Sequence, residues 1–226
     1  MEQATGQAVA AGWSATAAGI AIVGIVVSLA ALTLLHVLSP EFAWSWRMVS
    51  EYANGHHRWL LSVMFATWGL GSFALAIALG PVTHGWLGRI GLLFLVLAGT
   101  GEIMAAFFDI NHRLHGPAAM IGIPSLPIAA VLLTIALRRS GELVAPPAWS
   151  MHVTWISFVL MGAAMLLFMR SLSQAGVDLS AQAGPLTALP AGVTPVVGWA
   201  NRLLVAAYML WVVLTALPIL RHPPAS

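Results

Sequence analysis

The segment 101–116 carries closely spaced side chains that can do acid–base or ligand chemistry. Glu102 and Asp109 are seven residues apart, so on a helix they share one face and lie about 10 Å apart along the axis. Asp109 and His112 form an i,i+3 pair on nearly that face, and His115 follows three residues later. Carboxylates and imidazoles exchange protons and hydrogen-bond to polar ligands. The spacing therefore predicts a polar site around these four residues.

Glu102 lies inside an apolar stretch, where an ionised carboxylate costs several kcal/mol unless a partner compensates it. Arg202, beside Asn201, lies a turn or more into another apolar stretch and enters from the same predicted side. We therefore expect an ion pair between Glu102 and Arg202. The pair either only joins two helices or belongs to a binding or catalytic site.

Other polar residues gather on the same predicted side, which favours a pocket near the outer interface because polar side chains are costly elsewhere in a bilayer. An arginine there would recognise a phosphate or carboxylate. The alternative is that the histidines simply sit among lipid headgroups. The predicted ligand-binding residues are Glu51, His57, Glu102, Asp109, His112, His115, Asn201 and Arg202.

Asp109, His112, His115 and His57 are also side-chain types that zinc accepts. With a metal bound, Glu102 or Asp109 would act as general base toward a metal-activated water, giving a lipid-directed hydrolase. The sequence has no His-Glu-x-x-His helix motif. We expect no metal site, and zinc is kept as an alternative.

The chain has no cysteine, which excludes disulfides, thiolate metal sites and iron–sulfur clusters. Haem held between histidines of facing helices is a further alternative, with His36 and His115 or His84 and His152 as the pairs. No predicted helix carries histidines near both ends with matching partners, so we expect no cofactor.

The composition excludes a water-soluble fold, because 60% of the residues are hydrophobic, 7% are charged and the mean hydropathy is +0.91. The net charge of +2 comes from dispersed arginines and is too small for a nucleic-acid surface. We expect membrane lipids as partners, with a membrane protein partner as an alternative, and no nucleic acid.

A helix needs about 20 apolar residues to cross the hydrocarbon core, and six such windows are present. They are continuous apolar runs without two-residue alternation, which excludes spanning strands. The sequence therefore predicts an all-α, polytopic transmembrane helical bundle with six spans over residues 17–220, flanked by an N-terminal segment 1–16 and a tail 221–226. The windows are about 17–38, 59–79, 90–108, 117–137, 153–169 and 197–220.

Segment 39–54 predicts a short interfacial helix on the outer surface. Ser39 is a good N-cap and Pro40 suits the first helical position, while Asn54-Gly55 is a stop signal. The loop 171–195 is rich in Gly, Ala, Ser and Pro, and is predicted to be a lid or a mobile connection.

Smaller features within the spans have structural explanations. Met161, Met165 and Met169 recur at helical spacing, and we expect them to pack against neighbouring helices. Pro124 and Pro127 interrupt the fourth window, where they are expected to free backbone carbonyls and kink the helix.

An even number of spans places both termini on one side. The arginines divide four against five, but the adjacent Arg138 and Arg139 close the fourth window and Arg202 lies inside the sixth. We therefore expect a cytoplasmic N-terminus in a bacterial cytoplasmic membrane. No basic residue precedes the first window and no cleavage signature follows it, so we expect an uncleaved first helix.

Four short motifs carry a family resemblance: Leu38-Ser39-Pro40, Ser50-Glu51-Tyr52-Ala53, Phe108-Asp109 and His115-Gly116. Together they resemble the six-helix prokaryotic membrane family catalogued as domain of unknown function 998. The family more often has Phe-Pro before its acidic residue, where this chain has Phe107-Phe108. The resemblance implies six spans with polar motifs on one side, and no settled activity.

Taken together, these features predict an integral membrane protein that binds a lipid headgroup or small anionic ligand in a polar pocket near the outer face. The alternatives are a metal-dependent membrane hydrolase acting on lipid and a non-catalytic accessory subunit of a larger membrane complex.

Overall fold

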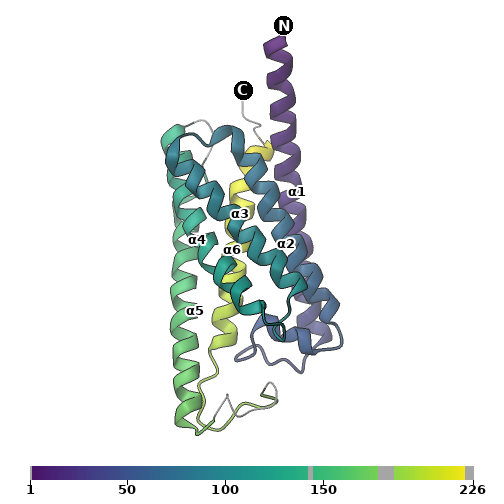
Figure 1. Cartoon of the computed structure of the whole chain (residues 1–226), viewed down its shortest axis with the longest axis vertical. Helices are drawn as coiled ribbons and strands as arrows, with labels where there is room; N and C mark the ends of the chain where they lie inside the picture. Colours follow the sequence, from purple (N-terminus) through teal and green to yellow (C-terminus); the bar gives the residue numbers. More distant parts are fainter. Residues whose placement is uncertain (1, 142–144, 178–185, 222–226) are drawn as a thin grey trace.

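The computed structural model describes residues 2–141, 145–177 and 186–221, with side chains from residue 12 onward (Figure 1). Six helices in these ranges are long and apolar enough to cross a membrane, and the same ranges contain no strand. The all-α fold is therefore confirmed, and the chain is a multi-pass membrane protein with six candidate spans. The helices are α1 (Glu2–Leu38), η1 (Val49–Asn54), α2 (Arg58–Leu79), η2 (Gly80–Val82), α3 (Gly85–Phe107), α4 (His115–Ser140), α5 (Ala148–Gln174) and α6 (Val197–Arg221), where η marks a 3₁₀ helix.

Each predicted window coincides with one long helix, but several helices run past their windows. α1 begins at Glu2, so residues 2–16 of the predicted N-terminal segment continue the helix of the first span. α5 extends beyond 153–169 at both ends. A helix satisfies its own backbone hydrogen bonds at any depth, so it need not end where the hydrocarbon ends. Of the predicted tail 221–226, Arg221 ends α6 and the rest lies outside the described residues.

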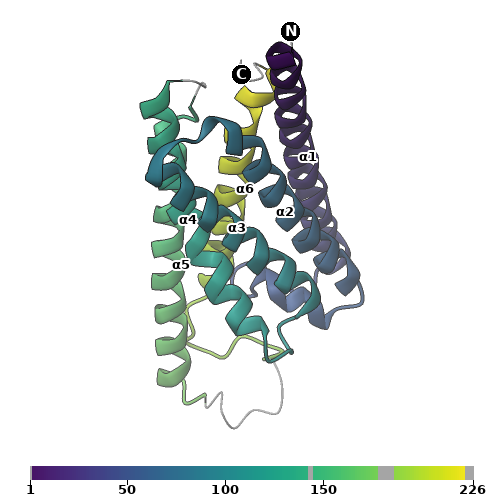
Figure 2. The ribbon, with the colours of Figure 1, turned by 45° about the horizontal axis from the view of Figure 1, so that its top comes forward.

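α6 is the central helix of the bundle. It contacts α1, α2, α4 and α5, and in Figure 1 it lies behind α2 and α3, between α1 and α5. Its Trp211 and Tyr208 are almost completely buried. The start of α1 and the end of α6 lie at one end of the bundle, while η1 lies at the opposite end, here called the η1 end (Figures 1 and 2).

α3 and α4 approach most closely where glycines face each other. A Cβ added to Gly101 would overlap the backbone of Gly122 and press on the carbonyl oxygen of Ala118. Small residues permit such close helix packing in membranes. This contact fixes the position of Glu102, the next residue of α3, relative to α4.

α4 contains both interior prolines, as expected. Proline lacks an N–H, so Pro127 leaves the carbonyl of Ile123, four residues earlier, without its helical donor. The hydroxyl of Tyr208 on α6 donates to that carbonyl oxygen at 2.7 Å. The freed carbonyl is therefore used to join α4 to α6.

Segment 39–54 is less helical than predicted. Its only helix is η1, at Val49–Asn54, and the preceding residues form turns and bends. Ser39 does not act as an N-cap, because its buried hydroxyl has no hydrogen-bond partner in the described part of the chain. The carbonyl oxygens of Trp44 and Arg47 accept hydrogen bonds from Arg202 on α6, and an α-helix through this segment would use such carbonyls internally.

The predicted loop 171–195 begins inside α5, which continues to Gln174. Its last part is tied back to that helix, since the backbone N–H of Thr194 donates to the hydroxyl of Ser171 at 3.3 Å. Residues 178–185 lie outside the described ranges, so the lid interpretation stays a prediction.

Candidate functional site

A cavity of about 360 Å³ lies among α2, α3, α4, α5 and α6 near the η1 end, where residues 48–50 cover it. Its walls are mainly apolar. Three predicted site residues line it, namely Glu102, His115 and Asn201. The full lining is Met48, Val49, Ser50, Phe65, Trp68, Gly101, Glu102, Ala105, Ile110, His115, Ala118, Ala119, Gly122, Ile123, Met161, Met165, Asn201, Leu204, Val205 and Tyr208.

Glu102 is the carboxylic acid of the cavity wall. It is only 7% exposed, and the hydroxyl of Ser72 on α2 donates to its Oε2 at 2.7 Å. Within the described part of the chain, Glu102 forms no ion pair and its Oε1 accepts no hydrogen bond. The cavity therefore contains a buried carboxyl group whose charge, when ionised, is not compensated by the protein.

Three aromatic residues form one side of the cavity. The rings of Phe65 and Trp68 on α2 are nearly parallel, with centroids 6.3 Å apart, and Trp68 meets Tyr208 of α6 edge-on at 6.4 Å. Trp68 is 4% exposed, and its indole Nε1–H is buried without a hydrogen-bond partner. Together the three rings give this side of the cavity an aromatic surface.

Polar groups also face the cavity near its cover. The Nδ1 of His115 lies 2.9 Å from the carbonyl oxygen of Phe108, and because a carbonyl only accepts, the neutral ring carries its proton on Nδ1 and leaves Nε2 as an acceptor. Asn201 uses its Oδ1 to accept the backbone N–H of Val49 at 2.8 Å. That bond holds the first residue of η1 against α6, so Asn201 both lines the cavity and anchors its cover.

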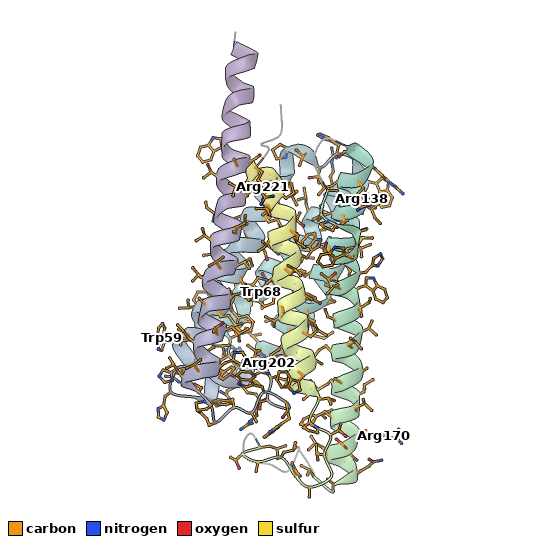
Figure 3. All side chains as sticks on the ribbon, turned by 180° about the vertical axis from the view of Figure 1, so that it is seen from behind. Trp59, Trp68, Arg138, Arg170, Arg202 and Arg221 are labelled. Carbon is orange, nitrogen blue, oxygen red and sulfur yellow. The ribbon has the colours of Figure 1, made fainter. Side chains whose placement is uncertain are left out.

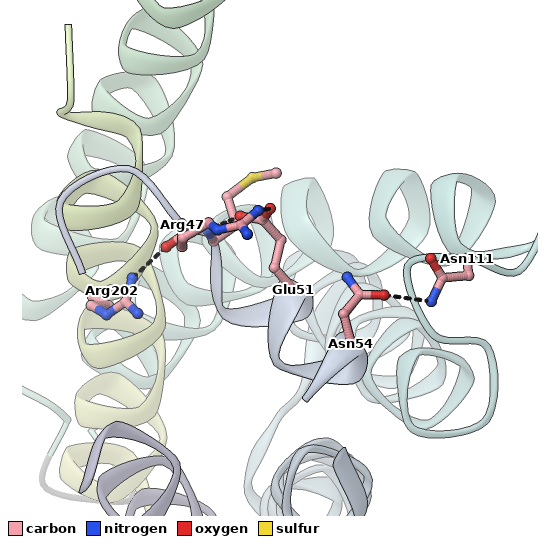
Figure 4. Close-up of polar contacts among 6 residues, drawn as sticks. Arg47, Glu51, Asn54, Asn111 and Arg202 are labelled. Atoms are coloured by element: carbon pink, nitrogen blue, oxygen red, sulfur yellow. Dashed lines mark hydrogen bonds and ion pairs between the residues drawn. The ribbon is translucent and has the colours of Figure 1, made fainter. Parts of the chain in front are cut away.

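Arg202 does not pair with Glu102, which corrects the ion pair expected from the sequence. Its guanidinium is not part of the cavity lining and donates instead to neutral acceptors at the η1 end, among them the Arg47 carbonyl oxygen shown in Figure 4. Its acceptors are His36 Nε2 at 2.7 Å, Arg47 O at 2.7 Å, Gly198 O at 3.1 Å, Trp44 O at 3.2 Å and Tyr52 Oη at 3.3 Å.

The helix geometry explains why Asn201 reaches the cavity and Arg202 does not. Consecutive residues of an α-helix point about 100° apart, so two neighbours on α6 face different partners. The polar surroundings of Arg202 suit its role as an anchor. Burial raises the pKa of the Tyr52 phenol, which stays neutral and accepts from the guanidinium.

Glu51 is also outside the cavity, because it pairs with Arg47. The two side chains are largely buried, and Arg47 Nη1 lies 2.7 Å from Glu51 Oε1. The other carboxylate oxygen accepts the backbone N–H of Met48 at 2.7 Å, and the Arg47 guanidinium stacks over Trp46 at 4.4 Å from the ring centroid. Glu51 therefore stabilises the start of η1 (Figure 4).

Asp109, His112 and His57 lie near the η1 end but do not line the cavity. Asp109 Oδ1 accepts the backbone N–H of Asn111 at 2.9 Å, and His112 Nδ1 accepts that of Leu114 at 3.1 Å. His57 precedes the first turn of α2 and is half-buried. These contacts shape the α3–α4 connection and the entry to α2, so the predicted eight-residue site divides into a cavity and its surroundings.

The same connection is joined to η1 by the Asn111 amide, which donates to Asn54 Oδ1 at 3.0 Å (Figure 4). The helix η1, whose first residues cover the cavity, is thus held at both ends, by Asn201 at Val49 and by Asn111 at Asn54. Both bonds involve side-chain amides.

The structure gives no support to the metal and haem alternatives. Among the described residues, no three His, Asp or Glu side chains converge as metal ligands would. His36 of α1 belongs to the first predicted haem pair, and both of its ring nitrogens are engaged, Nδ1 with the carbonyl oxygen of Leu32 and Nε2 with Arg202. In the second pair, His152 Nδ1 accepts from Trp155.

Sequence reasoning missed the aromatic wall and Ser72. Ser72 and Tyr208 could have been found from the sequence, because their hydroxyl groups lie in the middle of apolar windows and a buried hydroxyl needs a hydrogen-bond partner. Met161 and Met165 were expected to serve in packing, and they also line the cavity.

Comparison with known proteins places the chain in a family. No curated protein and no solved structure gives a significant match. The family model described as "Protein of unknown function (DUF998)" matches residues 22–218, a range that reaches from α1 to α6. Because this match covers well over half of the chain, the protein belongs to the DUF998 family, as the short motifs indicated.

Proposed function

We propose that the protein binds a small amphipathic molecule in the cavity beneath η1. The observation that carries the proposal is the cavity itself: its volume of about 360 Å³ lies within the range of small-molecule sites, about 300–1,000 Å³. Such sites combine apolar walls with a few polar groups, and here the polar groups include Glu102, His115 and Asn201. The apolar part of a lipid-like molecule would lie against the aliphatic and methionine side chains of the lining.

The lining argues against the anionic ligand expected from the sequence. That expectation depended on Arg202 reaching the pocket, and Arg202 instead anchors the segment after α1. No arginine is present among the lining residues, whereas a carboxyl group is. The polar end of the ligand is therefore proposed to complement a carboxyl group rather than an arginine.

We also propose that the η1 end faces the outside of a bacterial cytoplasmic membrane. By their positions in the helices and connections, four exposed arginines belong to the opposite end, Arg89, Arg138, Arg139 and Arg221, and three to the η1 end, Arg58, Arg113 and Arg170. Figure 3 labels Arg138 and Arg221 at the one end and Arg170 at the other. Arg47 and Arg202 are withdrawn into the protein and do not count as loop charges. The excess supports a cytoplasmic location for the end that carries the termini.

The orientation is testable because the chain has no cysteine of its own. Single cysteines at His56 and at Pro147, both exposed, would be treated in spheroplasts with a membrane-impermeant maleimide. We expect labelling of His56→Cys and protection of Pro147→Cys until the membrane is permeabilised. The reverse pattern would overturn the orientation.

The binding proposal is tested by filling the cavity. Ala119 lines it on α4, so Ala119→Phe would occupy its space, whereas Leu166 on α5 is 73% exposed and Leu166→Phe is a matched control. Native mass spectrometry of protein purified in mild detergent would compare bound small molecules. We expect a bound species on the wild type and on Leu166→Phe that is lost from Ala119→Phe. Equal retention by all three proteins would show that the cavity is not the site.

A further inference from the structure

We propose that the polar end of the ligand is a cation, an amine or quaternary ammonium group carried on an apolar tail. This inference rests on the proposed binding function and adds the chemical class of the ligand. The charge of the cavity wall, the aromatic side chains in that wall and the position of Arg202 outside it all favour a cation.

The charge of the wall comes from Glu102. This carboxyl is nearly buried, has one hydrogen bond from Ser72, and has no cationic partner among the described residues. A carboxylate in apolar surroundings is costly unless a positive charge lies close to it. A ligand ammonium group in the cavity would supply that charge, so its binding would be reinforced by the same burial that makes the empty site unfavourable.

The aromatic wall offers a second means of recognising a cation. Phe65, Trp68 and Tyr208 line the same cavity as Glu102, with centroid distances of 6.3 Å and 6.4 Å between successive rings. Aromatic faces attract ammonium groups, and quaternary ammonium ligands are commonly held by aromatic side chains. A carboxyl group beside a cluster of rings is a combination that favours a cation over an anion or a neutral alcohol.

Arg202 would oppose a cation if it lined the cavity, but it is not among the lining residues, and its donors bind His36 of α1 and carbonyl oxygens of the segment after α1. The remaining polar lining groups near the cover are compatible with an ammonium group. His115 keeps an acceptor nitrogen when its Nδ1–H donates to Phe108, and the Ser50 hydroxyl can accept an N–H.

The test compares four probes that share one tail: octylamine, octyltrimethylammonium, octanol and octanoate. Binding would be measured by calorimetry on the full chain in lipid nanodiscs, with empty nanodiscs subtracted to remove partitioning into lipid. We expect the wild type to bind both cations about tenfold or more tightly than octanoate. Glu102→Gln, which keeps an acceptor for Ser72, should lose about tenfold or more for the cations and change little for octanol.

Two further variants keep the result interpretable. Asp109→Asn removes a carboxyl outside the cavity and should leave all four affinities unchanged. Trp68→Phe retains a ring and should preserve part of the preference for the cations over octanoate. If Glu102→Gln fails to fold, this affinity ratio for Trp68→Phe is the second measurement. Equal binding of the four probes by the wild type, or a preference for octanoate, would overturn the cation inference while leaving an amphiphile site in place. Binding of none of the probes would overturn both the inference and the proposed function.

Discussion

Replacing Arg202 with alanine is expected to destabilise the protein by detaching the segment after α1 from α6. The shortest hydrogen bonds lost are those to His36 Nε2 and to the carbonyl oxygen of Arg47, each 2.7 Å. A buried group left unsatisfied costs about 1–3 kcal/mol. Arg202 is half-buried, so water can partly replace it, and each of the two acceptors should cost an amount near the lower end of this range. The expected loss in the free energy of unfolding is therefore about 2–3 kcal/mol.

The assay is reversible unfolding in mixed detergent micelles, followed by circular dichroism. Arg170→Ala is the control, because Arg170 is exposed on the last turns of α5, far from Arg202 in Figure 3. The control should change the free energy of unfolding by no more than about 0.5 kcal/mol. A loss below that figure for Arg202→Ala would refute the anchoring role.

A double-mutant cycle with Glu102→Gln tests the separation of the two charges directly. Since Arg202 and Glu102 share no hydrogen-bond partner, their effects on the unfolding free energy should add to within about 0.5 kcal/mol. The ion pair first expected from the sequence would produce a coupling energy above about 1 kcal/mol. Finding such a coupling would show that the two side chains meet.

Two further substitutions probe the helix contacts. Tyr208→Phe should cost about 1–2 kcal/mol, measured in the same unfolding assay, because the Ile123 carbonyl that Pro127 leaves without a helical donor also loses the Tyr208 hydroxyl. An unchanged stability would mean that another group replaces it. Gly101→Ala should lower the free energy of unfolding by about 2 kcal/mol or more, since the added Cβ overlaps Gly122. The control Gly162→Ala places its Cβ in open space and should be nearly neutral. Similar effects at both glycines would contradict the close packing of α3 on α4.

The spans were predictable because one physical requirement sets them. A backbone that crosses hydrocarbon must be helical and about 20 residues long, so runs of apolar residues mark both the element and its length. The rotation of each helix was not predictable by the same reasoning. Lipid is as apolar as the interior of the bundle, so no polar face identifies the buried side. Asn201 and Arg202 illustrate this, since adjacent residues face different parts of the protein.

The partners of Arg202 were hidden for a different reason. They include the backbone carbonyls of Trp44, Arg47 and Gly198, and every residue type possesses a carbonyl. A search among residue types finds only carboxylates as partners for an arginine and therefore selected Glu102. The same carbonyl contacts explain why the helix expected over 39–54 is reduced to η1.

The central position of α6 has a consequence for biogenesis. The five preceding helices are synthesised first, yet the helix that contacts four of them follows last in the chain. Until it inserts, the Ile123 carbonyl and the turns after α1 have no donor from Tyr208 or Arg202. The first four helices can already pack on one another, α1 on α2, α2 on α3 and α3 on α4, so the sixth helix completes the protein by joining the turns after α1 and the α5 helix to a bundle that has begun to form.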